Sequence, residues 1–104
     1  MATYLLAYRG GGMPETDEER TAVMAAWGAW FEGLGDAVKD GGNPFGPSAT
    51  IAADGSTGDG GTSQLTGYSI IAADSLAEAV GAAKDCPIRT SGGVIEVYET
   101  FDVM

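Results

Sequence analysis

Acid-base chemistry is the reaction type for which this sequence supplies the most suitable side chains, and Asp59 with Tyr68 is the pair that we select for it. An apolar pocket raises the pKa of a carboxyl group towards neutrality, where the group can exchange a proton with a substrate. Asp36 is the next carboxylate to consider. The alternative for Asp59 is an Asx-type turn ahead of Gly60, which involves no catalysis. The sequence alone leaves both interpretations open.

Aromatic residues offer a second kind of site, a pocket for a flat organic molecule. Trp27, Trp30 and Phe45 would form its walls, and Asn43 belongs to the same expected pocket. Arg9 would bind a carboxylate of the ligand. The alternatives are that the aromatic side chains are plain core and that Arg9 is a surface charge paired with a neighbouring acid.

Metal, phosphate and thiol chemistry find little support in the composition. The sequence has no histidine and one cysteine, Cys86, whereas zinc and most transition metals need several such ligands. Residues 54–59 lack the acids of a calcium-binding EF-hand loop. Gly10–Gly12 precede a helix start that is rich in acids and has no lysine, which disfavours phosphate. Cys86 has no histidine as a base, so we expect a structural role for it. We therefore expect no metal and no cofactor.

Length and charge limit the classes of partner. The chain has 104 residues, of which 44% are hydrophobic, and this predicts a single folded domain over residues 1–104. Its net charge of −10, with the basic residues dispersed among acids, disfavours nucleic acid and anionic membrane surfaces. We find no signal sequence and no apolar run of membrane-spanning length, so we expect a cytoplasmic location. The lone cysteine excludes an internal disulfide.

A long helix from Thr16 to about Asp40 is the element around which the expected fold is organised. Its start carries a capping box formed by Thr16 and Glu19, and Gly41-Gly42 are expected to end it. Apolar residues recur along it at steps of three and four, as on one buried helix face. These residues are Val23, Trp27, Trp30, Phe31, Leu34 and Val38.

Short strands and a second helix account for the rest of the chain. The patterns predict strands at 3–9, 48–53, 65–72 and 94–101. The second helix begins with the capping box of Ser75 and Glu78 and stops at Cys86-Pro87. Asp54-Gly55 is a hairpin-type turn, and residues 56–63 are either an irregular second arm or a mobile loop.

The predicted order is β-α-β-β-α-β, which is that of the ferredoxin-like fold. This is an α+β fold with an antiparallel sheet and two helices on one face. The other face would expose apolar strand residues, and a second copy of the sheet is the simplest cover for them. We therefore expect a homodimer that pairs sheet to sheet.

Several segments of the sequence together resemble the YCII-related or DGPF-domain family. They are YLLAYRG, MAAWGAWFEGL, a Gly-Gly-Asn-Pro turn, Asp59-Gly60 before a strand, LTGYSIIAADSLAEAVGAAKDCP and GGVIEVYETF. The resemblance covers nearly the whole chain. It implies a ferredoxin-like domain that dimerises into an α+β barrel, with a pocket between the sheet and the long helix.

The resemblance also implies two competing functions. Some YCII-like proteins carry a His paired with an Asp as an acid-base site, and a few relatives are dehydrochlorinase-like enzymes. This chain has no histidine, and the DGPF motif is reduced to Asp59-Gly60-Gly61-Thr62. One hypothesis is a domain that binds a small organic ligand, or acts through dimerisation, without an evident catalytic group. The other is a cofactor-free lyase or dehydrochlorinase-like enzyme that uses Asp59 and Tyr68. A regulatory or fused-domain role through dimerisation alone is a third possibility.

Overall fold

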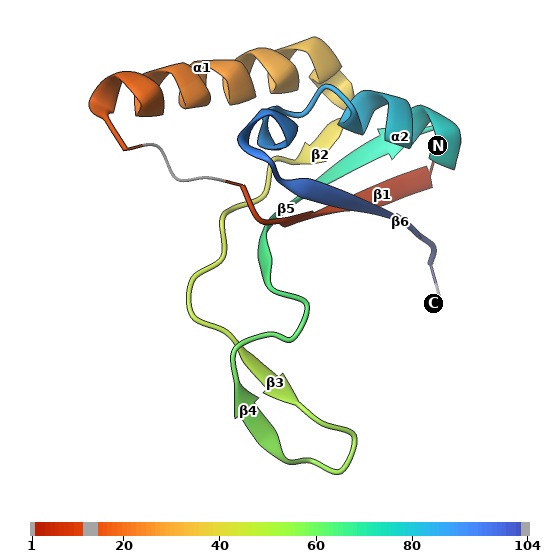
Figure 1. Cartoon of the computed structure of the whole chain (residues 1–104). Coiled ribbons are helices and arrows are strands. Elements are labelled where there is room, and N and C mark those ends of the chain that lie inside the picture. The colour runs from red at the N-terminus through yellow and green to blue at the C-terminus, as the bar shows by residue number, and fades with distance from the viewer. Residues whose placement is uncertain (1, 12–14, 103–104) are drawn as a thin grey trace.

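A four-stranded antiparallel sheet with helices on one face forms the body of the molecule, and a hairpin projects from it (Figure 1). The computed structural model describes residues 2–11 and 15–102, so Gly12 of the predicted strand-to-helix connection lies outside the described residues. The elements in chain order are β1 (Ala2–Arg9), α1 (Asp17–Leu34), the 3₁₀ turn η1 (Gly35–Ala37), β2 (Val38–Asp40), β3 (Ala49–Ile51), β4 (Thr57–Asp59), β5 (Leu65–Ala73), α2 (Leu76–Ala83), the 3₁₀ turn η2 (Pro87–Ser91) and β6 (Val94–Thr100). The sheet order is β2-β5-β1-β6, which confirms the predicted ferredoxin-like fold.

The core lies between the sheet and the helices. Side chains alternate between the two faces of a strand, and in β1 the residues Tyr4, Leu6 and Tyr8 face the helices. All three are almost completely buried. They pack in one cluster with buried residues of α1, β5, α2 and the segment after α2. These partners are Trp30, Ile71, Ala79, Ala83 and Cys86.

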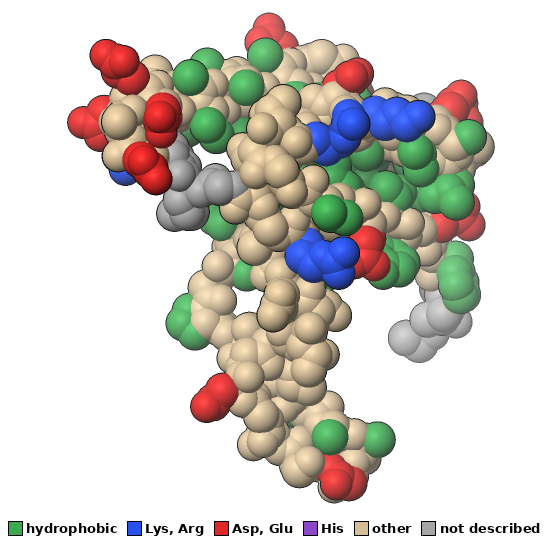
Figure 2. All heavy atoms as spheres, viewed as in Figure 1, with side chains coloured by type: hydrophobic (Ala, Val, Ile, Leu, Met, Phe, Trp, Pro, Cys, Tyr) green, Lys and Arg blue, Asp and Glu red, His purple; other side chains and the backbone are tan. Residues whose placement is uncertain are grey.

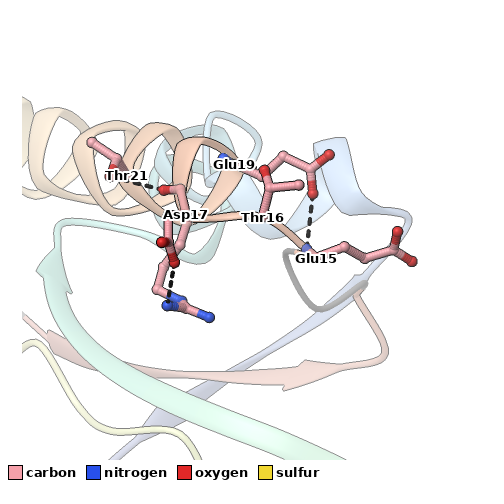
Figure 3. A network of polar contacts seen from close by, with 6 residues as sticks. Glu15, Thr16, Asp17, Glu19 and Thr21 are labelled. Carbon is pink, nitrogen blue, oxygen red and sulfur yellow. Dashed lines mark hydrogen bonds and ion pairs between the residues drawn. The ribbon is translucent and has the colours of Figure 1, made fainter.

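Both helices begin with the capping boxes that the sequence predicts. The Thr16 hydroxyl accepts a hydrogen bond from the Glu19 N–H at 3.0 Å, and the Glu19 carboxylate accepts one from the Glu15 N–H at 2.8 Å (Figure 3). In α2, Ser75 accepts from the Glu78 N–H at 3.2 Å. These bonds satisfy backbone donors that the first helical turn leaves without partners.

The predicted extension of the first helix to about Asp40 is wrong. α1 ends at Leu34 because Gly35 takes a φ of 56°, a positive value that interrupts the helix and that glycine adopts readily. The chain then turns through η1 into β2, where Val38 pairs with Ile71. Val38, which we assigned to the helical stripe, is therefore an edge-strand residue.

The predicted second strand at 48–53 is not part of the main sheet. β3 pairs with β4 in a separate two-stranded hairpin. The strand that follows the first helix in the ferredoxin-like fold is β2, at the edge of the main sheet. Over Thr57–Asp59 the structure shows the second arm rather than a loop. The predicted turn is confirmed, since the Ser56 N–H donates to the Asp54 carboxylate at 2.9 Å and Gly55 has a φ of 90°.

The hairpin makes the molecule more extended than most domains of its size. The radius of gyration is 15.1 Å, whereas a compact domain of this length has a radius of about 13 Å. In Figure 1 the hairpin projects on the side of the sheet opposite to the helices. The sheet thus has one face under the helices and one helix-free face beside the hairpin.

Candidate functional site

Aromatic rings fill the space between α1 and the sheet. Trp27 packs edge to face against Tyr8 of β1, with ring centroids 5.4 Å apart, and against Trp30 at 5.7 Å. Phe31 packs against both tryptophans, at 5.8 Å and 5.0 Å. The structure therefore places Trp27 and Trp30 in contact with each other and with the core cluster.

Trp30 also links the two helices. Its indole N–H donates to the carbonyl of Ala82 in α2 at 3.0 Å, so the one polar group of this buried side chain is satisfied. Beside it, an open groove of about 590 Å³ runs between α1 and the segment that includes α2 and η2. Its lining includes Ala29, Trp30, Gly33, Ala82, Asp85 and Pro87.

A short chain of hydrogen bonds, buried at its Tyr8 end and partly buried at its Gly41 end, links β1, β5 and the segment after β2. The Tyr8 hydroxyl donates to Ser69 Oγ at 2.8 Å, and Ser69 donates to the carbonyl of Gly41 at 2.8 Å. Burial raises the pKa of Tyr8 above its ordinary value and also raises the pKa of the neighbouring core thiol, Cys86. Neither group is thus ready to lose a proton near neutral pH. Tyr8 and Ser69 are not among the candidates from the sequence. The one signal that indicates a buried polar contact there is Ser69, a serine in the middle of an apolar strand.

Phe45 and Tyr68 form a stacked aromatic pair on the helix-free face. Their ring centroids are 5.7 Å apart and their planes differ by 17°. Tyr68 lies opposite Ala7 in the sheet register, which fixes it on the face away from Leu6 and Tyr8. Its hydroxyl donates to the Asp40 carboxylate at 3.3 Å. Phe45 is 45% exposed, so one side of this pair remains accessible.

Arg9 lies on the same helix-free face. Its guanidinium is 4.0 Å from the Glu96 carboxylate, and the Arg9 side chain is 47% exposed. Tyr98 donates a hydrogen bond to Glu96, and this bond raises the pKa of Tyr98. The helix-free face therefore combines an aromatic stack, one cation and carboxylates that accept hydrogen bonds.

The remaining candidate residues are exposed, and of these the backbone of Asn43 lies beside Gly67, next to the Phe45–Tyr68 pair. Asp59 is exposed on β4, where it lies opposite Ala49 in the hairpin register. Asp36 is exposed in η1, and Asn43 is exposed after β2. Within one chain the structure brings together Phe45 with Tyr68 and Trp27 with Trp30, on opposite faces of the sheet. It does not bring Asp59 to Tyr68.

A group of acidic side chains lies at one end of the molecule. Figure 2 shows acidic side chains gathered at the N-terminal end of α1, whose first turn contains Asp17, Glu18 and Glu19. Over residues 2–11 and 15–102, no three His, Cys, Asp or Glu side chains are grouped closely enough to hold a metal ion. In the same part of the chain, no helix is long and apolar enough to cross a membrane.

A family model described as the YCII-related domain matches residues 1–103. No curated protein matches the chain. Among solved structures, the chain is similar to 5-chloro-2-hydroxyhydroquinone dehydrochlorinase (TftG) from Burkholderia phenoliruptrix in complex with 2,5-dihydroxybenzoquinone. The two share 25% sequence identity with a TM-score of 0.52, over 95% of this chain and 93% of that chain.

Proposed function

The chain belongs to the YCII-related domain family, and from this premise we propose that it is a homodimer that binds a small, flat, hydroxylated ring compound on the helix-free face of its sheet. The observation that carries the proposal is the accessible Phe45–Tyr68 stack, with the Tyr68 hydroxyl held by Asp40. Such a pair offers a π surface for a flat ring and polar groups at its edge.

The surface of the single chain supports the homodimer. The accessible surface is 7183 Å², whereas a folded monomer of this mass exposes about 5,500 Å². The excess is larger than the roughly 800 Å² that each partner buries in a stable interface. Apolar side chains on the helix-free face are exposed as well, with Tyr98 at 51% and Val94 at 46%. A second copy over the β6 side of this face would cover them.

The chemistry of the face supports the ligand class. The solved neighbour was captured with 2,5-dihydroxybenzoquinone, a flat ring that carries hydroxyl and carbonyl oxygens. In this chain a ring of that kind would stack on Phe45. Its hydroxyl groups would donate to the Asp40 carboxylate, and an anionic oxygen would accept from the Arg9 guanidinium.

A dehydrochlorinase-like lyase is the second candidate, because the solved neighbour is a dehydrochlorinase. This version uses Asp59 and Tyr68 as the acid-base pair. Since Asp59 lies on the projecting hairpin, it would have to reach the Tyr68 site from the second copy. The substitution Asp59→Asn would then abolish turnover of a chlorinated hydroquinone and leave ring binding intact.

We also propose a cytoplasmic location. Cys86, the one cysteine in the sequence, is a buried free thiol. A free thiol is compatible with a reducing compartment.

Titration with 2,5-dihydroxybenzoquinone tests the binding proposal. We expect saturable binding by the wild type. Phe45→Ala should weaken it up to about tenfold, since an aromatic contact contributes ~0.5–1.5 kcal/mol. Met24→Ala is the matched control, because Met24 is 69% exposed on α1 and should leave affinity unchanged. No saturable binding, or equal affinity of the Phe45 variant and wild type, would overturn the proposal.

A further inference from the structure

The β3–β4 hairpin, residues 48–60, touches little else in its own chain. Among the described elements, no helix or strand of the body packs extensively against β3 or β4, which contact each other. Ile51 is 74% exposed, a high value for a β-branched apolar residue in a strand. Hydrophobic side chains are visible near the free end of the hairpin in Figure 2.

The hairpin is nonetheless built as a defined arm. The Thr50 hydroxyl donates to the carbonyl of Gly60 at 2.6 Å and accepts from the Thr62 N–H at 3.2 Å. The Ser48 hydroxyl accepts from the Gly61 N–H at 2.9 Å. An isolated two-stranded hairpin is marginal in water, because ordering its residues costs conformational entropy. Burial against a further surface would offset this cost.

The two faces of the arm differ. In the hairpin register, Ala49 lies opposite Asp59 and Ile51 lies opposite Thr57, so these residues share one face. Thr50 belongs to the other face, and its hydroxyl is already hydrogen-bonded within the arm, to Gly60 and Thr62. The first face presents an apolar side chain beside a carboxylate and is free to contact a partner.

The reach of the arm identifies that partner as a second copy of the chain. At about 3.3 Å per residue, the run from Ser48 to Ala52, where the turn begins, extends about 13 Å, whereas packed sheets are about 10 Å apart. The arm projects on the helix-free side (Figure 1). A second sheet packed on that face would therefore lie within its length, and two-fold symmetry would make the contact reciprocal.

Charge points to the same contact. The chain has a net charge of −10, and five of its 104 residues are Lys or Arg. Arg9 is on the helix-free face and is about half exposed, and the one ion pair that it makes within residues 2–11 and 15–102 is with Glu96 at 4.0 Å, the limit of an ion pair. An incoming carboxylate on the arm would be the complementary group.

We infer that the β3–β4 arm of each subunit clasps the other subunit, with Ile51 as the apolar contact and Asp59 as the ion-pair partner of Arg9 of the partner subunit. The inference rests on the proposed homodimer and adds the element that holds it together. It also explains how Asp59, remote from the sheet in its own chain, would come near the helix-free face.

Sedimentation equilibrium on the full chain tests the arm. Ile51→Ser should raise the dimer dissociation constant roughly tenfold, as expected for loss of one well-buried contact. Met24→Ser is its control, since it removes an exposed apolar side chain from α1 instead. If the wild type is a dimer and Ile51→Ser leaves its dissociation constant unchanged, the proposed arm contact is wrong, whereas the homodimer proposal still stands. A monomeric wild type would overturn both.

A charge swap tests the ion pair. Asp59→Arg and Arg9→Asp should each weaken the dimer severalfold, and the double variant should recover most of the loss because the pair is restored with reversed signs. Glu32→Arg changes the net charge by the same amount on the exposed side of α1 and should have little effect. Losses that add in the double variant, without recovery, would overturn the assignment of Asp59 to Arg9.

Discussion

The hydroxyl of Tyr8 donates to Ser69 Oγ at 2.8 Å inside the core, and this bond joins the two central strands through their side chains. Ser69 continues the chain to the carbonyl of Gly41, directly after β2. Three segments that are distant in sequence are thereby held by two side chains. Every buried side-chain polar atom in the described part of the molecule has such a partner.

Removing the middle of this chain should be costly. Ser69→Ala leaves the buried Tyr8 hydroxyl without its acceptor, and we expect a loss of about 1–3 kcal/mol in the free energy of unfolding. Tyr8→Phe removes the donor as well, so the double variant should lose less than the sum of the two single variants. Urea denaturation measures all three. Strictly additive losses would show that the hydrogen bond does not couple the two residues.

Stability should fall at alkaline pH because of Tyr8. Burial raises the pKa of Tyr8 in the folded state, whereas the unfolded chain keeps a pKa of about 10. Above that pH the unfolded chain releases a proton that the folded chain retains, so the free energy of unfolding falls as pH rises. Below it the contribution is constant. Denaturation at increasing pH should show a shallower decline for Tyr8→Phe than for wild type, and equal slopes would contradict the assignment.

Trp30 should be the most sensitive position on α1. It is buried, and its indole N–H binds α2. We expect Trp30→Ala to lower the free energy of unfolding by about 3–5 kcal/mol, the usual range for a large buried aromatic residue. Met24→Ala, on the exposed side of the same helix, should change it by less than about 0.5 kcal/mol. Similar losses at both positions would mean that α1 is covered differently in solution.

Glycines in this fold fall into two classes that substitution by alanine should separate. At Gly28 and Gly33 of α1, an added Cβ would meet no atom within 4 Å. Alanine there should stabilise the helix by up to ~1 kcal/mol. At Gly42, with a φ of 75°, the Cβ would lie 1.6 Å from the Tyr68 carbonyl oxygen. Thermal unfolding should show higher midpoints for the first two variants and a severe loss for Gly42→Ala; a neutral Gly42 variant would contradict this close approach.

Much of the fold could be predicted because the local signals agree with the tertiary structure. The apolar, β-branched run before Arg9 forms β1, and both capping boxes mark true helix starts. β2 was not predicted because it is only three residues long and Val38 continues the helical spacing of α1. The sequence shows the strand character of Thr50 and Ile51 but not the strand with which they pair.

The candidate site was harder to predict because it depends on which face a side chain occupies. β5 is apolar on both faces, so its sequence pattern did not assign Tyr68 to the helix side or to the helix-free side. The pairing of Tyr68 with Ala7 settles this, and it separates Tyr68 from Trp27. Asp40, which accepts the hydrogen bond from Tyr68, could not be identified from the sequence because its segment was expected to be helical.

The pairing of β1 with β6 has a consequence for synthesis on the ribosome. Thr3 lies opposite Thr100, so one edge of the sheet joins residues from nearly opposite parts of the sequence. Contacts of such long sequence separation slow folding, because loop closure precedes the gain from pairing. The central strand β1 emerges first yet has an open edge until β6 leaves the exit tunnel. This chain therefore completes its sheet only after translation has passed the last strand, and until then β1 depends on β5 alone.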